Sequence, residues 1–316
     1  MGRWLRRWSP RRHASKGGAA AGEEARRVGD FYAAFMDEAA IESKGIAPLK
    51  PQPDAFAAIA DRHALAHAIG GAARGRGPAE QHELRDRESV WNLDHAGPRR
   101  SIPDMPLSAA RGLGMADRQY YLSQSPRMAQ LRKQYREHIE RMFKLAGFTA
   151  PASRAARVFA LETAMAGVHA TRVESEDVHS AVQWKRADLP LKAPGIDWPA
   201  LLEAAGLSDP PVGIGWRPKA VAGLSALAAR EPLDAWKDWL AYHAVESAAA
   251  FLPRAFGDER FNSYGKAFSG VPQTRPRWQR GIDLTNFALR DAVGKLYVER
   301  YFPAETKVKP KANWIR

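Results

Sequence analysis

The sequence contains no cysteine. It can therefore form no disulfide, thiolate nucleophile or cysteine-ligated zinc site, and its fold does not depend on the redox state of its compartment. It also has no run approaching the roughly 18 apolar residues that a membrane-spanning helix needs. After a basic start, the polar stretch GGAAAGEEARR stands where a secretory signal carries an apolar segment of roughly 7–15 residues. The sequence indicates neither a signal peptide nor a transmembrane segment, and it leaves the localisation open.

Acidic residues are missing from both ends of the chain. The first sixteen residues carry a charge of +6 and the last ten carry +4, so only about +3 of the net +13 belongs to the rest. We therefore expect no nucleic-acid binding by the body of the protein. Residues 1–22 are expected to form a basic, disordered arm and residues 308–316 a basic tail. The segment Arg3–Arg12, interleaved with Trp4 and Trp8, leaves binding to an anionic membrane surface as an alternative.

The H-E-x-x-H pattern of zinc peptidases does not occur in the sequence. That pattern places two imidazoles one helical turn apart, with a glutamate between them that activates the zinc-bound water. His63-Ala-Leu-Ala-His67 has the spacing of the ligands but an alanine where the base must stand. We interpret it as a surface-facing histidine pair, and metal binding by His63 and His67 remains the alternative.

Two other histidine groups fall short of a metal site. In His82-Glu83-Leu84-Arg85-Asp86 an aspartate replaces the second histidine, and the surrounding sequence predicts no helix to orient ligands. His169, Glu174 and His179 lack regular spacing, although Glu162 lies on the same predicted helix as His169. Nucleophile-elbow, Walker and dinucleotide-binding glycine patterns do not occur either. We therefore assign no catalytic residue, no metal ligand and no cofactor to this chain.

Apolar residues, which make up 45% of the chain, recur mainly at helical spacing. The pattern predicts a mainly α fold with little or no β-structure, in one helical domain over residues 23–307. Helices are expected at 23–44, 54–69, 126–146, 151–169, 198–205, 218–229, 233–251 and 289–302, and the best strand candidate is 212–216. Trp236 and Trp239 are expected in the core. Residues 72–110 have weak periodicity, and we interpret them either as a long loop or as a stretch scrambled by insertions and deletions in the gene.

Five blocks of sequence occur in a familiar order. They are GDFYAAFMDEAAIESKGIAPL from Gly29, RGLGMADRQYYL from Arg111, ALETAMAGVHATRVESED from Ala160, WKDWLAYHAVESAAAFLPRAF from Trp236 and PRWQRGIDLTNFALRDAVGKLYVERYFPAETK from Pro276. Together they closely resemble the N-terminal region of the neprilysin-like zinc metallopeptidases, in its bacterial form. The patterns G-L-G-x-x-D-R-x-Y-Y-L and G-K-L-Y-V-E-x-x-F are the most specific, and apart from 72–110 the resemblance covers roughly residues 25–307.

The resemblance implies a helical lobe that encloses the peptide substrate in front of a zinc-containing catalytic lobe. The zinc ligands of that family lie outside the matched region, so none can be placed here, and we expect the chain alone to be inactive. Intact bacterial relatives are typically periplasmic, envelope-anchored or secreted.

A second hypothesis is an interaction module that binds peptides or complements a separately encoded catalytic half. The helix ending near Pro303 supplies the surface for it, and we expect the partner to pack on Leu289, Val293, Leu296 and Tyr301.

Overall fold

The computed structural model describes residues 22–75, 112–171, 173–174, 182–207, 212–215 and 218–302. They divide into two compact units. The first unit comprises, among these residues, 22–40 and 275–302, and the second comprises the described residues from 41 to 274. Helices dominate both units, as the sequence pattern predicts. None of the helices in these ranges combines the length and the apolarity that crossing a bilayer requires.

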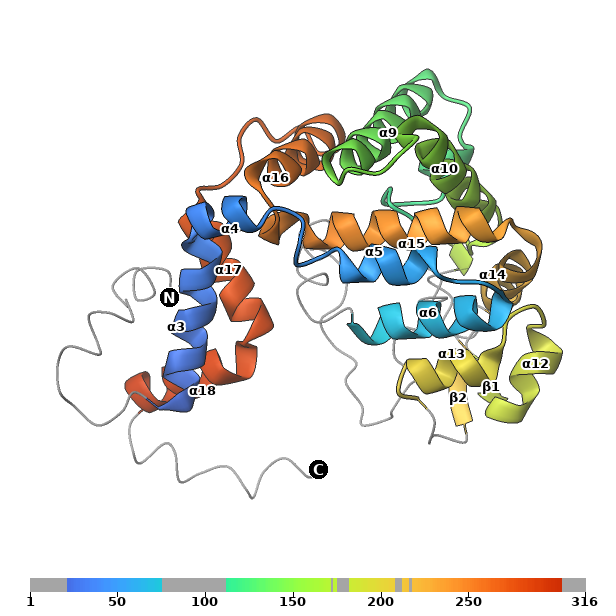
Figure 1. The fold of residues 1–316 in the computed structure, drawn as a ribbon. Coiled ribbons are helices and arrows are strands. Elements are labelled where there is room, and N and C mark those ends of the chain that lie inside the picture. The colour runs from blue at the N-terminus through green and yellow to red at the C-terminus, as the bar shows by residue number, and fades with distance from the viewer. Residues whose placement is uncertain are drawn as a thin grey trace. The chain divides into compact units, whose positions relative to one another are not determined.

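In the described part of the first unit, three helices pack together (Figure 1). They are α3 (Glu23–Met36), α17 (Arg277–Ala288) and α18 (Arg290–Tyr301). Their shared core consists of Val28 from α3, Ile282 from α17 and the pair Ala292 and Val293 from α18. A further helix, α4 (Glu38–Lys44), follows α3 across the boundary between the units.

The second unit contains most of the helices and the small sheet. Its elements in chain order are α5 (Pro51–Ala57), α6 (Arg62–Gly75), α8 (Gln119–Leu122), α9 (Pro126–Leu145), α10 (Pro151–Val168), β1 (Val182–Lys185), the 3-10 turn η2 (Arg186–Asp188), α12 (Leu189–Lys192), α13 (Trp198–Ala204), β2 (Val212–Gly215), α14 (Pro218–Arg230), α15 (Leu233–Ala248), the 3-10 turn η3 (Ala249–Phe251), α16 (Arg254–Arg260) and the π-helix η4 (Phe261–Phe268). Strands β1 and β2 pair antiparallel, with Val182 opposite Gly215 and Lys185 opposite Val212. The strand expected at 212–216 is therefore present, and its partner β1 was not predicted.

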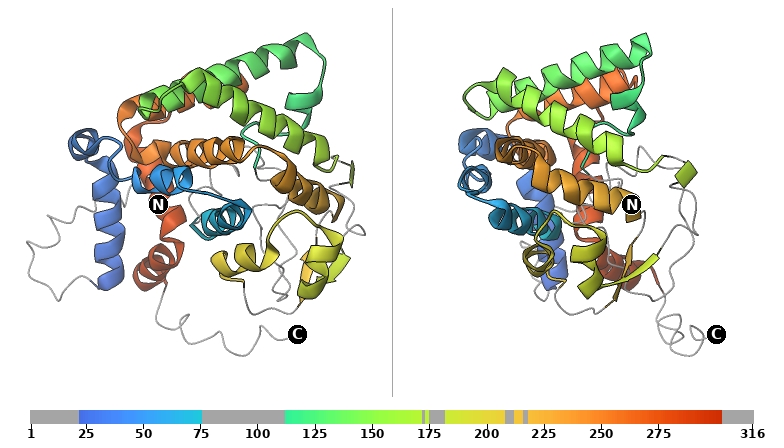
Figure 2. Two further views of the ribbon diagram at one scale, coloured as in Figure 1. Left: turned by 45° about the vertical axis from the view of Figure 1, so that its right-hand side comes forward. Right: turned by 90° about the vertical axis from the view of Figure 1, so that its right-hand side faces the viewer.

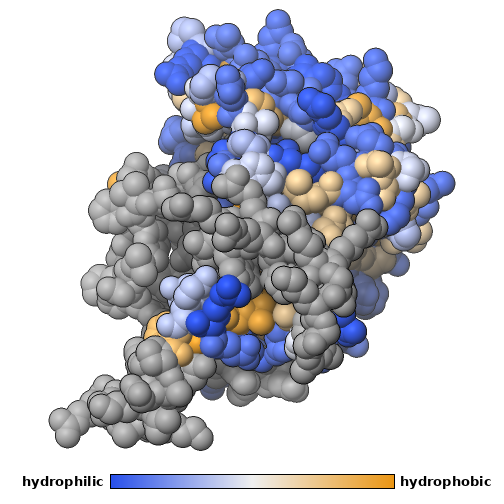
Figure 3. All heavy atoms as spheres, turned by 90° about the vertical axis from the view of Figure 1, so that its left-hand side faces the viewer, coloured by the Kyte–Doolittle hydropathy of each residue, from blue (hydrophilic) through white to orange (hydrophobic). Residues whose placement is uncertain are grey.

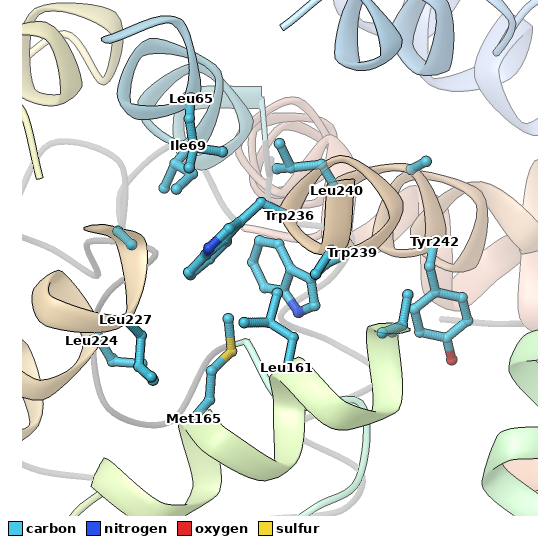
Figure 4. Close-up of a cluster of buried hydrophobic side chains, with 14 of the residues drawn as sticks. Leu65, Ile69, Leu161, Met165, Leu224, Leu227, Trp236, Trp239, Leu240 and Tyr242 are labelled. Carbon is cyan, nitrogen blue, oxygen red and sulfur yellow. The ribbon is translucent and has the colours of Figure 1, made fainter. Parts of the chain in front are cut away.

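The core of the second unit surrounds α15, which packs against α5, α6, α9 and α10 (Figures 1 and 2). Trp236 and Trp239 are 1% and 2% exposed, which confirms that they are core residues. Figure 4 shows them between side chains of three other helices, namely Leu65 and Ile69 of α6, Leu161 and Met165 of α10, and Leu224 and Leu227 of α14. Burying large aromatic side chains at such a meeting point contributes strongly to stability, because each removes about 150–250 Å² from water.

Several helix ends are formed by capping residues that can be recognised in the sequence. Ser125 caps α9 by accepting a hydrogen bond from the Met128 N–H at 3.3 Å, and Pro126 occupies the first helical position. Asp197 caps α13 in the same way through the Ala200 N–H at 3.1 Å. Gly147 follows α9 with a φ of +75°, a conformation that favours glycine after a helix.

Two predicted helices are each divided in the structure. The helix expected at 23–44 breaks at Asp37, whose side chain accepts a hydrogen bond from the Ala40 N–H and so starts α4 separately. The helix expected at 54–69 is two helices, α5 and α6, and Asp61 caps the second through the Ala64 N–H at 2.8 Å. In both places an aspartate side chain accepts a backbone N–H that would otherwise bond within a continuous helix. The spacing of apolar residues does not reveal this competition.

The helix that was expected to end at residue 69 continues, as α6, through Gly70 and Gly71 to Gly75. Gly70 faces α13 so closely that a Cβ added to it would overlap the Leu201 carbonyl oxygen and would lie 3.0 Å from the Ala204 Cβ. Gly71 has open space in front of it. Gly70 therefore serves close helix packing and not helix termination.

Candidate functional site

A pocket with a volume of about 630 Å³ lies between α5, α6 and α15 in the second unit. Its wall is formed largely by small side chains, and its polar groups include three imidazoles and a hydroxyl: His63, His67, His243 and Ser247. None of the described residues that line it is a carboxylate. Its volume falls within the range of about 300–1,000 Å³ that is usual for ligand pockets. It is the candidate site that the described residues offer.

His63 and His67 both line this pocket from α6, one helical turn apart, as their spacing predicts. The His63 Nδ1 lies 2.7 Å from the Asp197 Oδ2, and because a carboxylate only accepts, Nδ1–H is the donor. This hydrogen bond and the charge of Asp197 raise the pKa of His63 above its ordinary value. The side chain of His63 is 71% exposed.

His243 lines the pocket from α15 and is anchored on its other side. Its Nε2 donates to the Oε1 of Glu162 at 2.9 Å, and its ring lies 4.7 Å from the ring of Trp239. Glu162 itself is fully buried in α10. The third imidazole of the pocket is thus fixed in place by a carboxylate behind it.

Glu162 is the centre of a buried polar cluster. Its Oε2 accepts hydrogen bonds from the hydroxyls of Tyr121 at 2.6 Å and Tyr135 at 2.8 Å, and from the Gly114 N–H at 3.3 Å. Burial, reinforced by the Glu162 charge, raises the pKa of both tyrosines well above the ordinary value, so their hydroxyls remain donors. This cluster is not apparent from the sequence. The only sign of it there is that Glu162 lies beside Leu161 and Met165 on an apolar face of the predicted helix, where a carboxylate needs hydrogen-bond donors.

The same cluster explains the G-L-G-x-x-D-R-x-Y-Y-L motif. The Tyr121 hydroxyl accepts the Met115 N–H at 3.0 Å, and the Gly112 carbonyl accepts the Trp239 indole N–H at 3.0 Å. Gly112 has a φ of +130°, and a Cβ on Gly114 would overlap the Tyr135 hydroxyl. The motif therefore fastens one backbone segment onto α9, α10 and α15.

A second buried cluster surrounds His138 of α9. Its Nε2 lies 3.1 Å from Glu246 and its Nδ1 lies 2.9 Å from Glu259. Arg260 donates to Glu246 at 2.7 Å, and Arg141 lies 2.8 Å from Glu259. Burial alone lowers the pKa of His138, but the two glutamates outweigh it and raise the pKa above the ordinary 6.5. Burial raises the pKa of Glu246, while Arg260 and His138 lower it more strongly, to about 2.

The His138 cluster predicts a maximum of stability in mildly acidic solution. Because its pKa is raised, protonated His138 stabilises the folded state. This contribution to the free energy of unfolding is complete below pH 6.5 and is lost as the pH rises through the pKa of His138 in the folded state. Because its pKa is lowered, ionised Glu246 also stabilises the folded state. Its contribution to the free energy of unfolding is complete above pH 4.5 and is lost as the pH falls towards 2. We expect the free energy of unfolding, measured in urea, to peak between these limits. His138→Gln should lower it by about 3 kcal/mol at pH 6 and remove the decline above pH 6.5. An unchanged alkaline decline in this variant would contradict the assignment.

Only part of the remaining metal candidates from the sequence lies in the described residues. Glu174 accepts hydrogen bonds from the N–H and the hydroxyl of Thr171 at 2.8 and 2.9 Å, and His169 is the C-terminal cap of α10. His179 and the segment His82–Asp86 lie outside the described residues. In the parts of the chain that the structure covers, no three histidine, aspartate or glutamate side chains are placed to hold a metal ion together.

The apolar side chains that α18 leaves exposed differ from those that were expected to contact a partner. Leu289, Val293 and Leu296 pack into the core of the first unit, and Val293 is only 3% exposed. The expected stripe is therefore mostly covered by α3 and α17. Four other apolar side chains at the end of α18 remain exposed by 40–53%, and we call them the α18 aromatic patch: Tyr297, Val298, Tyr301 and Phe302. Of the residues expected to contact a partner, only Tyr301 belongs to it.

The aromatic rings of this patch gather together, since Tyr297 lies 5.0 Å from Tyr301 and 6.3 Å from Phe302 between ring centroids. On the face drawn in Figure 3, which is mostly polar, apolar side chains lie in small patches. Clustered exposed aromatic side chains are typical of surfaces that bind another protein.

Comparison with known proteins agrees with this architecture. The model of the N-terminal region of peptidase family M13 matches residues 10–314. The zinc metalloprotease Zmp1 of Mycobacterium tuberculosis is 29% identical in its open state, with a TM-score of 0.75 over 97% of this chain and 48% of Zmp1. Its inhibitor complex gives 29% identity and a TM-score of 0.76, over 97% of this chain and 46% of that one.

PepO from Lactobacillus rhamnosis HN001 shares the fold at 12% identity, with a TM-score of 0.67 over 97% of this chain and 47% of PepO. No curated protein sequence matches the chain. The chain thus spans about half the length of the solved structures it resembles. Because the family model covers nearly the whole sequence, the chain belongs to peptidase family M13, of which it represents the N-terminal domain.

Proposed function

We propose that this chain is the substrate-enclosing helical lobe of a neprilysin-like zinc metalloendopeptidase and does not hydrolyse peptides by itself. The main support is its correspondence to about half of the zinc metalloprotease Zmp1. Hydrolysis by a zinc-bound water requires protein ligands for the ion and a base beside it. The sequence has no H-E-x-x-H, and His63 and His67 have no glutamate between them. Zinc belongs to the intact enzyme in this proposal, and peptides are its substrates.

The isolated chain should therefore fail a direct test of activity. With added Zn²⁺ and a fluorogenic peptide that full-length Zmp1 cleaves, we expect cleavage no faster than without protein, and no effect of a chelator. Zmp1 assayed in parallel is the positive control. Chelator-sensitive cleavage that co-purifies with the chain and survives in His63→Gln/His67→Gln would overturn the proposal, because a zinc site would then exist elsewhere in it.

The α18 aromatic patch favours a second candidate function, in which the lobe binds a separately encoded catalytic half. Four adjacent apolar side chains that remain 40–53% exposed are an unusual surface for a protein that acts alone. Aromatic side chains of this kind often contribute most of the binding energy at an interface.

The catalytic half of Zmp1 is a suitable probe for this second function. We expect it to bind the chain in analytical ultracentrifugation, and Val298→Glu/Tyr301→Glu should weaken binding by about tenfold or more. Ala129→Glu/Gln130→Glu, on the exposed face of α9, introduces the same two acids as a control. Equal binding by both variants would exclude the α18 aromatic patch as the docking surface.

A further inference from the structure

The pocket wall at α6 has the features of a metal site. His63 and His67 are four residues apart on one helix, so their side chains lie on the same face with Cβ atoms about 5–6 Å apart. Both line the same pocket, and His67 enters none of the hydrogen bonds among the described residues. This spacing is the one with which helices present two imidazoles to a single ion.

Asp197 supplies the second, independent observation. Its Oδ2 accepts the Nδ1–H of His63 at 2.7 Å, while its Oδ1 accepts the Ala200 N–H at the start of α13. In neutral His63 the proton is thereby held on Nδ1, and the lone pair is on Nε2. Metal-binding histidines characteristically donate their other N–H to a carboxylate in this manner, which fixes the tautomer and makes the ligand more basic. His63 is thus already in the form that a metal ion requires.

The pocket also leaves room for the rest of a coordination sphere. The neighbouring α6 side chains that line it are small, namely Ala64, Ala68 and Ala72, with Gly71 among them. The volume of about 630 Å³ accommodates an ion together with several water molecules. The described lining residues include no carboxylate, so the ligands that they offer are imidazole nitrogen atoms. Imidazole ligands suit Cu²⁺, Ni²⁺ and Zn²⁺ and not the oxygen-seeking Mg²⁺ or Ca²⁺.

We propose that His63 and His67 bind one divalent transition-metal ion through imidazole nitrogens, with Asp197 orienting His63 and water completing the coordination. The ion ties together two turns of α6 and, through Asp197, joins them to the start of α13. The site is not hydrolytic, because residues 64–66 between the histidines are Ala, Leu and Ala and supply no base. Binding weakens in acid, because protons compete with the ion for the imidazole nitrogens.

Calorimetric titration of the full 316-residue chain with Cu²⁺, Ni²⁺ and Mg²⁺ at pH 7.5 tests the proposal. We expect one equivalent of Cu²⁺ to bind more tightly than Ni²⁺, in the general order of affinities, and no binding of Mg²⁺. His63→Gln and His67→Gln should each remove that equivalent. His179→Gln, which alters a histidine of another part of the sequence, should retain it.

Asp197→Asn isolates the role of the carboxylate, because asparagine can still cap α13. We expect this variant to bind Cu²⁺ about 10–100-fold more weakly. Thermal unfolding with and without Ni²⁺ gives a second readout, and the rise in Tm should vanish in His67→Gln. Equal Cu²⁺ binding by His63→Gln/His67→Gln, or unchanged affinity in Asp197→Asn, would overturn the proposal. Neither result depends on whether the chain acts as the lobe of a peptidase.

Discussion

Replacing Glu162 by alanine should lower the free energy of unfolding by about 4 kcal/mol, the largest effect that we expect from any single substitution in the described residues. The side chain is fully buried and accepts hydrogen bonds from two tyrosine hydroxyls, the His243 imidazole and the Gly114 N–H. Alanine leaves all of these donors without an acceptor in a place that water does not reach. An unsatisfied buried donor costs about 1–3 kcal/mol, and the cavity adds to this.

Equilibrium unfolding in urea, followed by tryptophan fluorescence, measures the change. Glu140→Ala on the exposed side of α9 is the control, and we expect it to alter the free energy by less than about 0.5 kcal/mol. Tyr121→Phe removes one donor and should cost about 1–3 kcal/mol, partly because the Met115 N–H also loses its acceptor. If Glu162→Ala is no more damaging than Glu140→Ala, the hydrogen bonds around Glu162 do not stabilise the fold.

Gly70→Ala should lower the free energy of unfolding by about 3 kcal/mol, whereas Gly71→Ala should raise it by about 0.5–1 kcal/mol. Both glycines lie inside α6. The new methyl group at Gly70 would overlap the backbone carbonyl of Leu201, and neither helix can relieve that overlap by a side-chain rotation. At Gly71 the methyl group meets nothing within 4 Å, so alanine only reduces the conformational freedom of the unfolded chain.

This pair of adjacent substitutions contains its own control, because the chemical change and the helix are identical. Differential scanning calorimetry should place the melting temperatures of the two variants on opposite sides of that of the unaltered chain. Equal destabilisation by both would mean that helix propensity, and not the contact between α6 and α13, decides the result.

Much of the fold was accessible from the sequence because its helices are amphipathic and carry local end signals. Ser125 with Pro126, and Asp197 before α13, mark helix starts that the structure reproduces. The predicted helix boundaries were wrong where one residue type can play two structural roles. Asp37 and Asp61 interrupt apolar patterns that continue past them, and Gly70 looks like a helix end although it makes room for α13. Deciding between such uses requires knowing which helices are neighbours.

The candidate site was less accessible, for a physical reason. The pair His63 and His67 is visible in the sequence because its spacing is local. The partners Asp197 and His243 come from positions more than a hundred residues away, and only the packing of α6 against α13 and α15 brings them to the same region. The orientation of α18 was also misjudged in part. The helix is apolar on several sides, so its sequence does not indicate that Val293 and Leu296 face α3 while Tyr297 and Tyr301 remain exposed.

The hydrogen bond between the Trp239 indole and the Gly112 carbonyl joins groups 127 residues apart. During synthesis the segment that begins at Gly112 cannot form this hydrogen bond until α15 has left the ribosome. At the usual rate of about 5–20 residues per second, that interval is on the order of ten seconds. Within this interval Trp184 and Trp198 emerge before Trp236, which belongs to the same buried core. Until α15 has been synthesised, the nascent chain therefore exposes aromatic side chains that the finished fold buries.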